Sequence, residues 1–295
     1  MTSPRQKLTK LLAGRELLTM PCCFDGLSAR LIEQSGFKLA FMSGFAVSAT
    51  RIGSPDTGLL SYGEIIDQGR NICENVSIPV LGDADTGYGN ALNIKRTVSG
   101  FAKAGFACAM IEDQVMPKRC GHTKGKKIVD RQEALSRIRA AVDARDEGAD
   151  ILIMARTDAR ATDGMNEALY RCQAFADQGA DIIFLEAPQS IEEMETFCSQ
   201  VPGVKMANMI QNGITPLLSS AQLQEIGYKI AAYPLTLLST SIQAMKNALD
   251  ILKQGGYPDH ISFPELQKIV GFNEYYREEK RYSYSIEKPD PHNEN

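Results

Sequence analysis

The sequence predicts a single (β/α)8 barrel, and three observations support this class of fold. Eight short aliphatic and β-branched runs recur along the 295-residue chain with longer helical patterns between them, an alternation that is typical of a parallel sheet. A chain of this length accommodates one such barrel. Nucleotide-binding folds lose their main support, because no G-x-G-x-x-G motif follows the first run and no G-x-x-x-x-G-K-[ST] motif occurs.

The predicted strands alternate with amphipathic helices in a regular order. The strands are expected at residues 16–20, 38–42, 78–83, 107–112, 150–156, 181–187, 204–209 and 229–234. The clearest helix lies between the fourth and fifth strands, with Asp130 as its N-cap, Glu133 at the capping-box position and Gly148 as its stop. The chain contains no low-complexity linker, so we expect one domain over residues 1–282 and a loose, proline-containing tail over 283–295.

Composition excludes several classes of protein. No uncharged apolar run is long enough to span a bilayer, and the N-terminus lacks the pattern of a secretory signal. Seven cysteines without a C-x-x-C pair predict free thiols rather than disulfides or a zinc ribbon. The net charge of -4, with scattered basic residues, does not favour nucleic acid. We therefore expect a cytoplasmic protein that binds a small molecule and neither nucleic acid nor membrane.

Polar residues gather at the carboxyl ends of the predicted strands, where barrels carry their chemistry. They are Ser43 and Gly44, Asp83 and Asp85, Glu112 and Asp113, Arg156 and Asp158, Glu186, Asn208 and Tyr233. Converging carboxylates would repel one another and take up protons unless a cation neutralised them. Oxygen-only ligands favour Mg²⁺, with Mn²⁺ as the alternative. A purely structural alternative is that Asp83 and Asp85 form Asx-turns or cap the next helix.

Residues 113–130 form the most unusual predicted loop. This segment has no apolar period and contains five lysines and arginines around Cys120, so we expect an exposed lid after the fourth strand. Nearby positive charge lowers the pKa of a thiol, which predicts that Cys120 exchanges protons near neutral pH. The alternative interpretations are an inert thiol, a locally bonded His122 and lysines that form a solvated face.

Five segments carry a resemblance to a known family: "EDQVMPKRCGH", "DADTGYG", "MARTDA", "FMSG" and "KMANM". Together they resemble the isocitrate lyase/phosphoenolpyruvate mutase superfamily, over about residues 15 to 282. The K-R-C-G-H run is similar to that of the carbon–carbon lyase branch, since the phosphonate mutases lack its cysteine. The resemblance implies a (β/α)8 barrel whose eighth helix swaps between neighbours, dimers paired into a homotetramer, and a Mg²⁺-dependent site for 2-hydroxy di- or tricarboxylates.

The resemblance also implies roles for individual residues. Asp85 would hold the metal, with Asp83 and Glu112 binding it through water. Ser43, Gly44, Arg156 and Asn208 match groups that bind substrate carboxylates, while Asp56 and Glu186 match further acidic positions of the site. Lys118, Arg119, Cys120, Gly121 and His122 would belong to a gating loop over residues 113–130.

The implied reaction is cleavage of the C2–C3 bond with release of a 2-oxo acid. The other fragment leaves as a carbanion delocalised into its carboxylate, and Cys120 would protonate it. Closure of the loop would keep water away from this species.

Two positions depart from the pattern of methylisocitrate lyases, which have glycine and arginine there. Phe45 would narrow the pocket, and Thr123 would weaken recognition of a third carboxylate. Both changes move weight toward smaller alkylmalates of the 2,3-dimethylmalate type or hydrolysis of oxaloacetate, and 2-methylisocitrate stays among the expected substrates. The remaining alternatives are a phosphonate-forming phosphomutase, against which Cys120 counts, and a catalytically silent binding or storage barrel, against which the intact acidic cluster counts.

Overall fold

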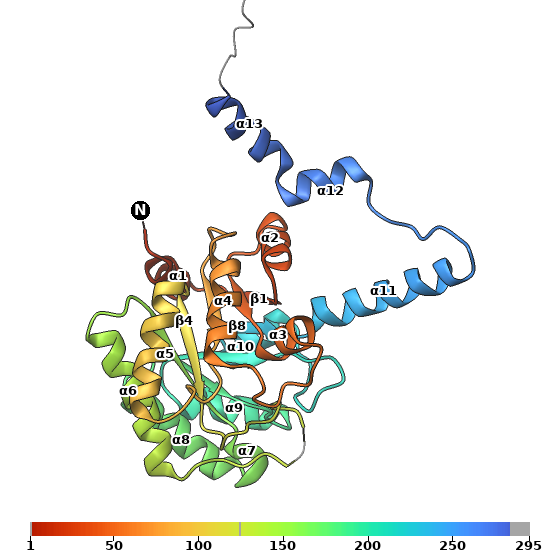
Figure 1. Ribbon diagram of the computed structural model, residues 1–295. Helices are drawn as coiled ribbons and strands as arrows, with labels where there is room; N and C mark the ends of the chain where they lie inside the picture. Colours follow the sequence, from red (N-terminus) through yellow and green to blue (C-terminus); the bar gives the residue numbers. More distant parts are fainter. Residues whose placement is uncertain (1, 124, 284–295) are drawn as a thin grey trace, which may run out of the picture. The chain divides into compact units, whose positions relative to one another are not determined.

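A computed structural model describes residues 2–123 and 125–283 and shows a closed parallel barrel (Figure 1). Its strands are β1 (Leu18–Cys23), β2 (Ala40–Met42), β3 (Val80–Asp83), β4 (Cys108–Glu112), β5 (Leu152–Thr157), β6 (Ile182–Leu185), β7 (Val204–Asn208) and β8 (Ile230–Tyr233). Each strand pairs with the next along the chain, and β8 pairs with β1 in the register Leu18 to Ile230. The predicted fold is confirmed: four strands, β1, β2, β3 and β5, begin two residues later than expected, and β1 also ends three residues later.

Helices between residues 26 and 226 surround the barrel, and others precede and follow them along the chain (Figure 1). They are α1 (Pro4–Leu12), α2 (Gly26–Gln34), α3 (Gly44–Arg51), α4 (Tyr62–Cys73), α5 (Ala91–Ala104), α6 (Arg131–Asp146), α7 (Ala159–Thr162), α8 (Met165–Asp177), α9 (Ile191–Gln200), α10 (Ser220–Ile226), α11 (Thr236–Lys253), α12 (Phe263–Val270) and α13 (Phe272–Tyr282). The predicted N-cap of α6 is confirmed, because Asp130 Oδ1 accepts the Glu133 N–H at 2.8 Å. The second half of the expected capping box is wrong, since the Glu133 carboxylate binds Arg137 instead.

The hydrophobic core has two parts, separated by the strands. Alternate strand residues point inward and fill the barrel, among them Met20, Met110 and Phe184, while the others pack against the surrounding helices. Leu8 of α1 is fully buried in the interior part of the core. The amino-terminal end of the barrel is therefore covered, which leaves the carboxyl ends of the strands for a site.

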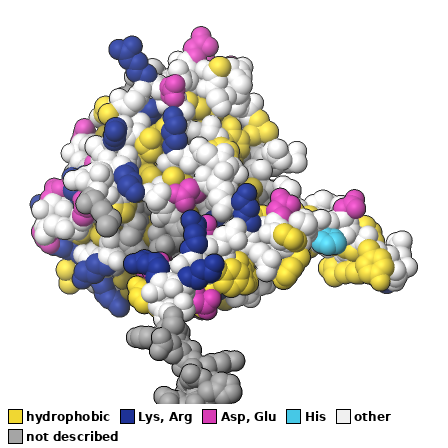
Figure 2. Space-filling model, turned by 90° about the horizontal axis from the view of Figure 1, so that it is seen from above, with side chains coloured by type: hydrophobic (Ala, Val, Ile, Leu, Met, Phe, Trp, Pro, Cys, Tyr) yellow, Lys and Arg dark blue, Asp and Glu magenta, His cyan; other side chains and the backbone are white. Residues whose placement is uncertain are grey.

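The chain divides into two units, Met1–Ala244 and a second that begins at Met245. In the second unit no side chain of α12 or α13 is buried. Hydrophobic side chains lie at the surface of this part of the chain (Figure 2), namely Leu249, Leu252, Tyr257, Ile261, Phe263, Leu266, Val270, Phe272, Tyr275, Tyr276 and Tyr282. A single domain over residues 1–282 therefore stays a prediction, and the expected tail falls outside the described residues beyond Ser283.

Two expectations from composition can be compared with the structure. All seven cysteines are free thiols, as predicted. Within residues 2–123 and 125–283, none of the helices combines the length and the apolar character needed to cross a bilayer.

Candidate active site

A small cavity of about 60 Å³ lies at the carboxyl ends of the strands. Nine predicted site residues line it: Ser43, Phe45, Asp56, Asp83, Cys120, Gly121, His122, Glu186 and Asn208. Gly44, Asp85, Glu112, Lys118 and Arg156 are buried but are not among its lining residues, and Arg119 is exposed. The structure thus brings together residues from β2, β3, β6, β7 and the loop after β4.

The acidic cluster contains a buried ammonium group. Nζ of Lys118 lies 2.5 Å from Asp56 Oδ1 and 2.8 Å from Asp85 Oδ1, and its side chain is only 3% exposed. Burial acts to lower the pKa of Lys118, but the surrounding carboxylates raise it well above its usual value. Burial, together with Asp85, raises the pKa of Asp83 to about 6. The gating loop therefore supplies a permanent positive charge to the carboxylates at the end of β3.

Local backbone geometry orients Asp83. Its Oδ1 accepts the Asp85 N–H at 3.0 Å, which is the Asx-turn of the structural alternative, and its Oδ2 accepts the Gly44 N–H at 3.3 Å. A Cβ at Gly44 would lie 2.6 Å from Asp83 Oδ2, so only glycine allows this approach. Asp85 has a φ of 49°, an uncommon conformation for a non-glycine residue that is often found at functional sites.

The carboxylate oxygens of Asp85 and Glu112 are the candidate ligands for a divalent cation. In the described part of the chain, Oε1 of Glu112 is buried without a hydrogen bond, and Oδ1 of Asp85 has no partner other than the Lys118 ammonium group, which is itself a cation. Among the described residues, no three His, Cys, Asp or Glu side chains form a ready metal-binding group. Mg²⁺ does not require such a group, because it binds one or two carboxylates and completes its shell with waters and substrate. The oxygens of Asp85 and Glu112 therefore fit Mg²⁺, and the predicted ligands remain a prediction.

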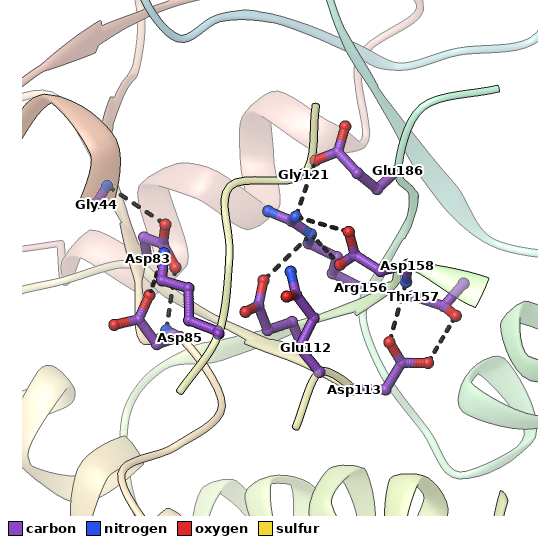
Figure 3. Close-up of polar contacts among 12 residues, drawn as sticks. Gly44, Asp83, Asp85, Glu112, Asp113, Gly121, Arg156, Thr157, Asp158 and Glu186 are labelled. Atoms are coloured by element: carbon purple, nitrogen blue, oxygen red, sulfur yellow. Dashed lines mark hydrogen bonds and ion pairs between the residues drawn. The ribbon is translucent and has the colours of Figure 1, made fainter. Parts of the chain in front are cut away.

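Arg156 binds three carboxylates on neighbouring strand ends (Figure 3). Its Nε lies 2.9 Å from Asp158 and 3.3 Å from Glu112, and its Nη2 lies 3.2 Å from Glu186. Burial acts to raise the pKa of Glu186, but Arg156 and His122 hold it well below its usual range. Burial raises the pKa of Glu112 well above its usual value despite the attraction of Arg156. The pKa values of the two glutamates beside one guanidinium are thus shifted in opposite directions.

Asp113 holds the end of β5, from which Arg156 and Asp158 project. Its carboxylate accepts the Thr157 hydroxyl at 2.6 Å and the Asp158 backbone N–H at 3.0 Å (Figure 3). It also binds Arg171 at 3.0 Å. The strand-end pattern of the sequence included Asp113 but gave it no role. Its position directly after Glu112 was the only signal.

The environment of Cys120 corrects one expectation. Burial raises the pKa of the Cys120 thiol, and the nearby carboxylates of Glu186 and Asp56 act in the same direction. The predicted lowering was wrong, because burial has the largest effect on this thiol and two of the loop's cations, Lys118 and Lys126, are paired with carboxylates. The thiol therefore stays protonated at neutral pH, as a proton donor must be.

His122 connects the loop to distant parts of the barrel. Its Nε2 lies 3.0 Å from Glu186 Oε1, and its Nδ1 accepts the backbone N–H of Ile214 at 3.1 Å. The acceptor role of Nδ1 places the proton of the neutral ring on Nε2. The interpretation of His122 as a locally bonded loop imidazole is therefore wrong.

Several residues that shape the site were not predicted from the sequence. In the sequence, Lys126 is only one residue of a charged run, yet its side chain is buried against Asp158. The cavity also has an apolar wall formed by Phe41, Met110, Phe184 and Met206. The alternation of inward-facing residues along the strands is the signal that indicates such a wall.

Comparisons with known proteins agree on one family. Residues 8–253 match the family described as phosphoenolpyruvate phosphomutase. A 2,3-dimethylmalate lyase from Eubacterium barkeri is 40% identical over 282 residues, which cover 94% of this chain and 97% of that protein.

Two solved structures give the same result for the fold. An oxaloacetate acetylhydrolase bound to 3,3-difluorooxalacetate superposes with a TM-score of 0.91 at 34% identity, covering 95% of this chain and 97% of that one. A phosphonopyruvate hydrolase in complex with oxalate and Mg²⁺ superposes with a TM-score of 0.84 at 29% identity, covering 95% and 99% of the two chains.

Proposed function

The chain belongs to the phosphoenolpyruvate phosphomutase family of the isocitrate lyase/phosphoenolpyruvate mutase superfamily, and on this premise we propose that it is a Mg²⁺-dependent carbon–carbon lyase. Its substrate is a 2-hydroxy dicarboxylate of the 2,3-dimethylmalate type, which it cleaves between C2 and C3 to a 2-oxo acid and a second carboxylate. The observation that carries this proposal is the position of Cys120 in the cavity wall together with Asp83 and Asp56, where burial raises the pKa of its thiol.

In this proposal Asp85 would hold Mg²⁺, and Asp83 and Glu112 would bind it through water. When bound, the cation polarises the 2-hydroxyl and the adjacent carboxylate of the substrate. Asp56 lines the cavity with a pKa that burial raises, so it is the carboxylate placed to accept the hydroxyl proton. Ser43 and the first turn of α3 favour a substrate carboxylate through the positive end of the helix dipole, while the N–H groups of Gly44 and Ala46 bind Asp83 and Ser43.

The carbanion that leaves C2 takes its proton from Cys120. Closure of the gating loop places Gly121 and His122 in the cavity wall beside the thiol, and this excludes water while the carbanion exists. The resulting thiolate regains a proton after product release. Arg156 acts by fixing Glu112 and Glu186 and so shapes the site around the substrate.

The lining of the cavity favours a small, alkyl-substituted substrate. Phe45, Phe41, Met110 and Phe184 form apolar walls, whereas the buried cations Lys118 and Arg156 already bind carboxylates of the protein. A third substrate carboxylate would have no cation of its own here. Hydrolysis of oxaloacetate is the second candidate, supported by the small cavity and by the similarity to an oxaloacetate acetylhydrolase.

The test is a substrate panel with purified protein and Mg²⁺. We expect a 2-oxo acid from 2,3-dimethylmalate, detected with lactate dehydrogenase, and less from 2-methylisocitrate. Oxaloacetate is followed by direct detection of oxalate and acetate, and phosphonopyruvate by phosphorus NMR. A panel that yields no cleavage product contradicts the proposal, and phosphonopyruvate turnover alone would favour a phosphomutase.

Replacement of the thiol tests its role. Cys120→Ser should lower kcat by about 100-fold or more, as loss of a general acid does, and should leave Mg²⁺ affinity unchanged. Cys73→Ala, which removes a thiol on α4, is the matched control and should keep wild-type kcat. Equal activity of the Cys120→Ser enzyme and the control would exclude this proton donor.

We propose the finer points of assembly on the same premise. The protein forms a homotetramer of paired dimers with swapped C-terminal helices, and it works in the cytoplasm. The exposed apolar faces of α12 and α13 support the assembly.

A further inference from the structure

Lys126 lies on the returning arm of the gating loop with its side chain only 2% exposed. Its Nζ lies 2.7 Å from Asp158 Oδ1 and donates to the carbonyl oxygen of Gly121. The adjacent Lys127 is exposed. One of two neighbouring lysines in a polar loop is therefore buried between two acceptors, at the cost of its hydration.

The first acceptor belongs to the reactive part of the loop. Gly121 directly follows Cys120 and packs against the Arg156–Glu186 ion pair, because a Cβ at this glycine would lie 2.5 Å from Arg156 Nη2 and 2.6 Å from Glu186 Oε2. Holding the Gly121 carbonyl therefore also holds the backbone that carries the thiol.

The second acceptor belongs to the barrel. Asp158 follows β5, and its backbone N–H is bound by Asp113. Its carboxylate also binds Arg156, at 2.9 Å to Nε and 3.1 Å to Nη2. The ammonium group of Lys126 therefore links the loop to the same carboxylate that orients Arg156.

Lys126 differs from Lys118 and His122, whose side chains also anchor the loop. Lys118 contacts Asp56 and Asp85, and His122 contacts Glu186, so both act on groups assigned to the reaction. Lys126 is not among the residues that line the cavity. Its contacts hold the loop against the barrel without touching the substrate position.

We propose that Lys126 is a positioning residue that keeps the gating loop closed by linking the carbonyl beside Cys120 to Asp158. Opening the loop hydrates Lys126 and separates this link, so closure gains a buried ion pair that a neutral side chain cannot form. Loss of the link shifts the loop toward open states, in which Cys120 is accessible.

The test measures alkylation of individual cysteines by iodoacetamide, quantified by peptide mass spectrometry. Lys126→Met retains a long side chain without the charge, and Lys127→Met is the matched control one residue away. We expect Cys120 in the Lys126→Met protein to react about tenfold faster than in wild type, since removal of a buried partner favours local opening. The Lys127→Met protein should react at the wild-type rate.

Cys172, which is fully buried on α8, serves as an internal control for global unfolding. Its reactivity should be the same in all three proteins. Unchanged Cys120 reactivity in the Lys126→Met protein would overturn the proposal, and so would a parallel rise at Cys172, which would show a general structural role.

Steady-state kinetics provide the second measurement, and this one rests on the proposed lyase activity. Lys126→Met should lower kcat/KM for 2,3-dimethylmalate while Mg²⁺ affinity stays at the wild-type value, because Asp85 is not in contact with Lys126. The alkylation experiment needs no turnover, so failure of the lyase proposal and failure of the positioning role are distinguishable.

Discussion

At the carboxyl ends of the strands, the ionisation of each buried side chain depends on its charged neighbours. Lys118 faces Asp56 and Asp85, and Arg156 faces Glu112, Asp158 and Glu186. Burial alone would neutralise most of these carboxyl groups. The two cations keep some of them ionised while others retain raised pKa values, so the site contains both proton acceptors and strongly ionised groups at neutral pH.

The raised pKa of Asp83 predicts how Mg²⁺ binding depends on pH. Asp83 is ionised at pH 7 and mostly protonated at pH 5, because its pKa is raised to about 6. Protons therefore compete with the cation, and Mg²⁺ affinity should fall by about tenfold for each pH unit below 6. Isothermal titration calorimetry between pH 5 and 7 measures this.

Asp83→Asn removes the group that takes up the competing proton, so the decrease of Mg²⁺ affinity with falling pH should become shallower. Asp143→Asn, an exposed change on α6, should keep the wild-type slope. An affinity that is constant over this range, or that rises as the pH falls, would contradict the assignment of Asp83 to the metal site.

At the scale of elements, the base and the tip of the loop over residues 113–130 are held by different kinds of contact. Its two arms pair near the barrel, where the Val115 N–H donates to the Lys127 carbonyl at 2.8 Å and the Val129 N–H to that of Asp113 at 2.9 Å. Gln114 binds the backbone of Arg119 twice, at 2.8 and 2.9 Å. The tip, in contrast, is held through side chains of Lys118, His122 and Lys126.

The close packing of Gly121 predicts the effect of adding one methyl group. Gly121→Ala would place a Cβ against the Arg156–Glu186 pair, which other carboxylates hold in position, so the loop cannot close fully. We expect kcat/KM to fall by about 100-fold, as misplaced catalytic groups do, with little change in melting temperature. Kinetics and thermal unfolding measure the two effects.

Gly63→Ala is the control, because a Cβ there meets nothing closer than 3.9 Å. It should retain wild-type kinetics and stability. A fully active Gly121→Ala enzyme would show that the closed geometry of the loop is not needed for turnover.

At the scale of the whole molecule, apolar packing closes one end of the barrel and the candidate active site lies at the other. Leu8 closes the amino-terminal end, and the polar residues gather at the other. The unit that begins at Met245 has a different character, since α12 and α13 bury no side chain. Exposed apolar helices of this kind are typical of surfaces that a partner chain covers.

The apolar face of α12 predicts the assembly state. Phe263, Leu266 and Val270 lie on one face of the helix and are 68%, 41% and 41% exposed. Size-exclusion chromatography with light scattering should give four times the chain mass of 32.4 kDa for wild type. Leu266→Glu should give smaller species, because it places a charge in the expected interface.

Lys268→Glu introduces the same residue on the same helix and is the matched control, expected to remain tetrameric. A monomeric wild-type protein would contradict the assembly. Equal masses for both variants and wild type would exclude this face of α12 as an interface.

The order of strands and the N-cap Asp130 were predictable from the sequence alone. The sequence also predicted that Asp83, Glu112 and Glu186 gather at one end of the barrel. Periodicity and strand ends are local properties, and the parallel barrel brings successive strand ends together by necessity. Only the tertiary structure decided that the Cys120 thiol stays protonated and that Lys126 rather than Lys127 is buried. Desolvation and ion pairing depend on which distant groups surround a side chain, and those distances are not encoded in the spacing of residues along the chain.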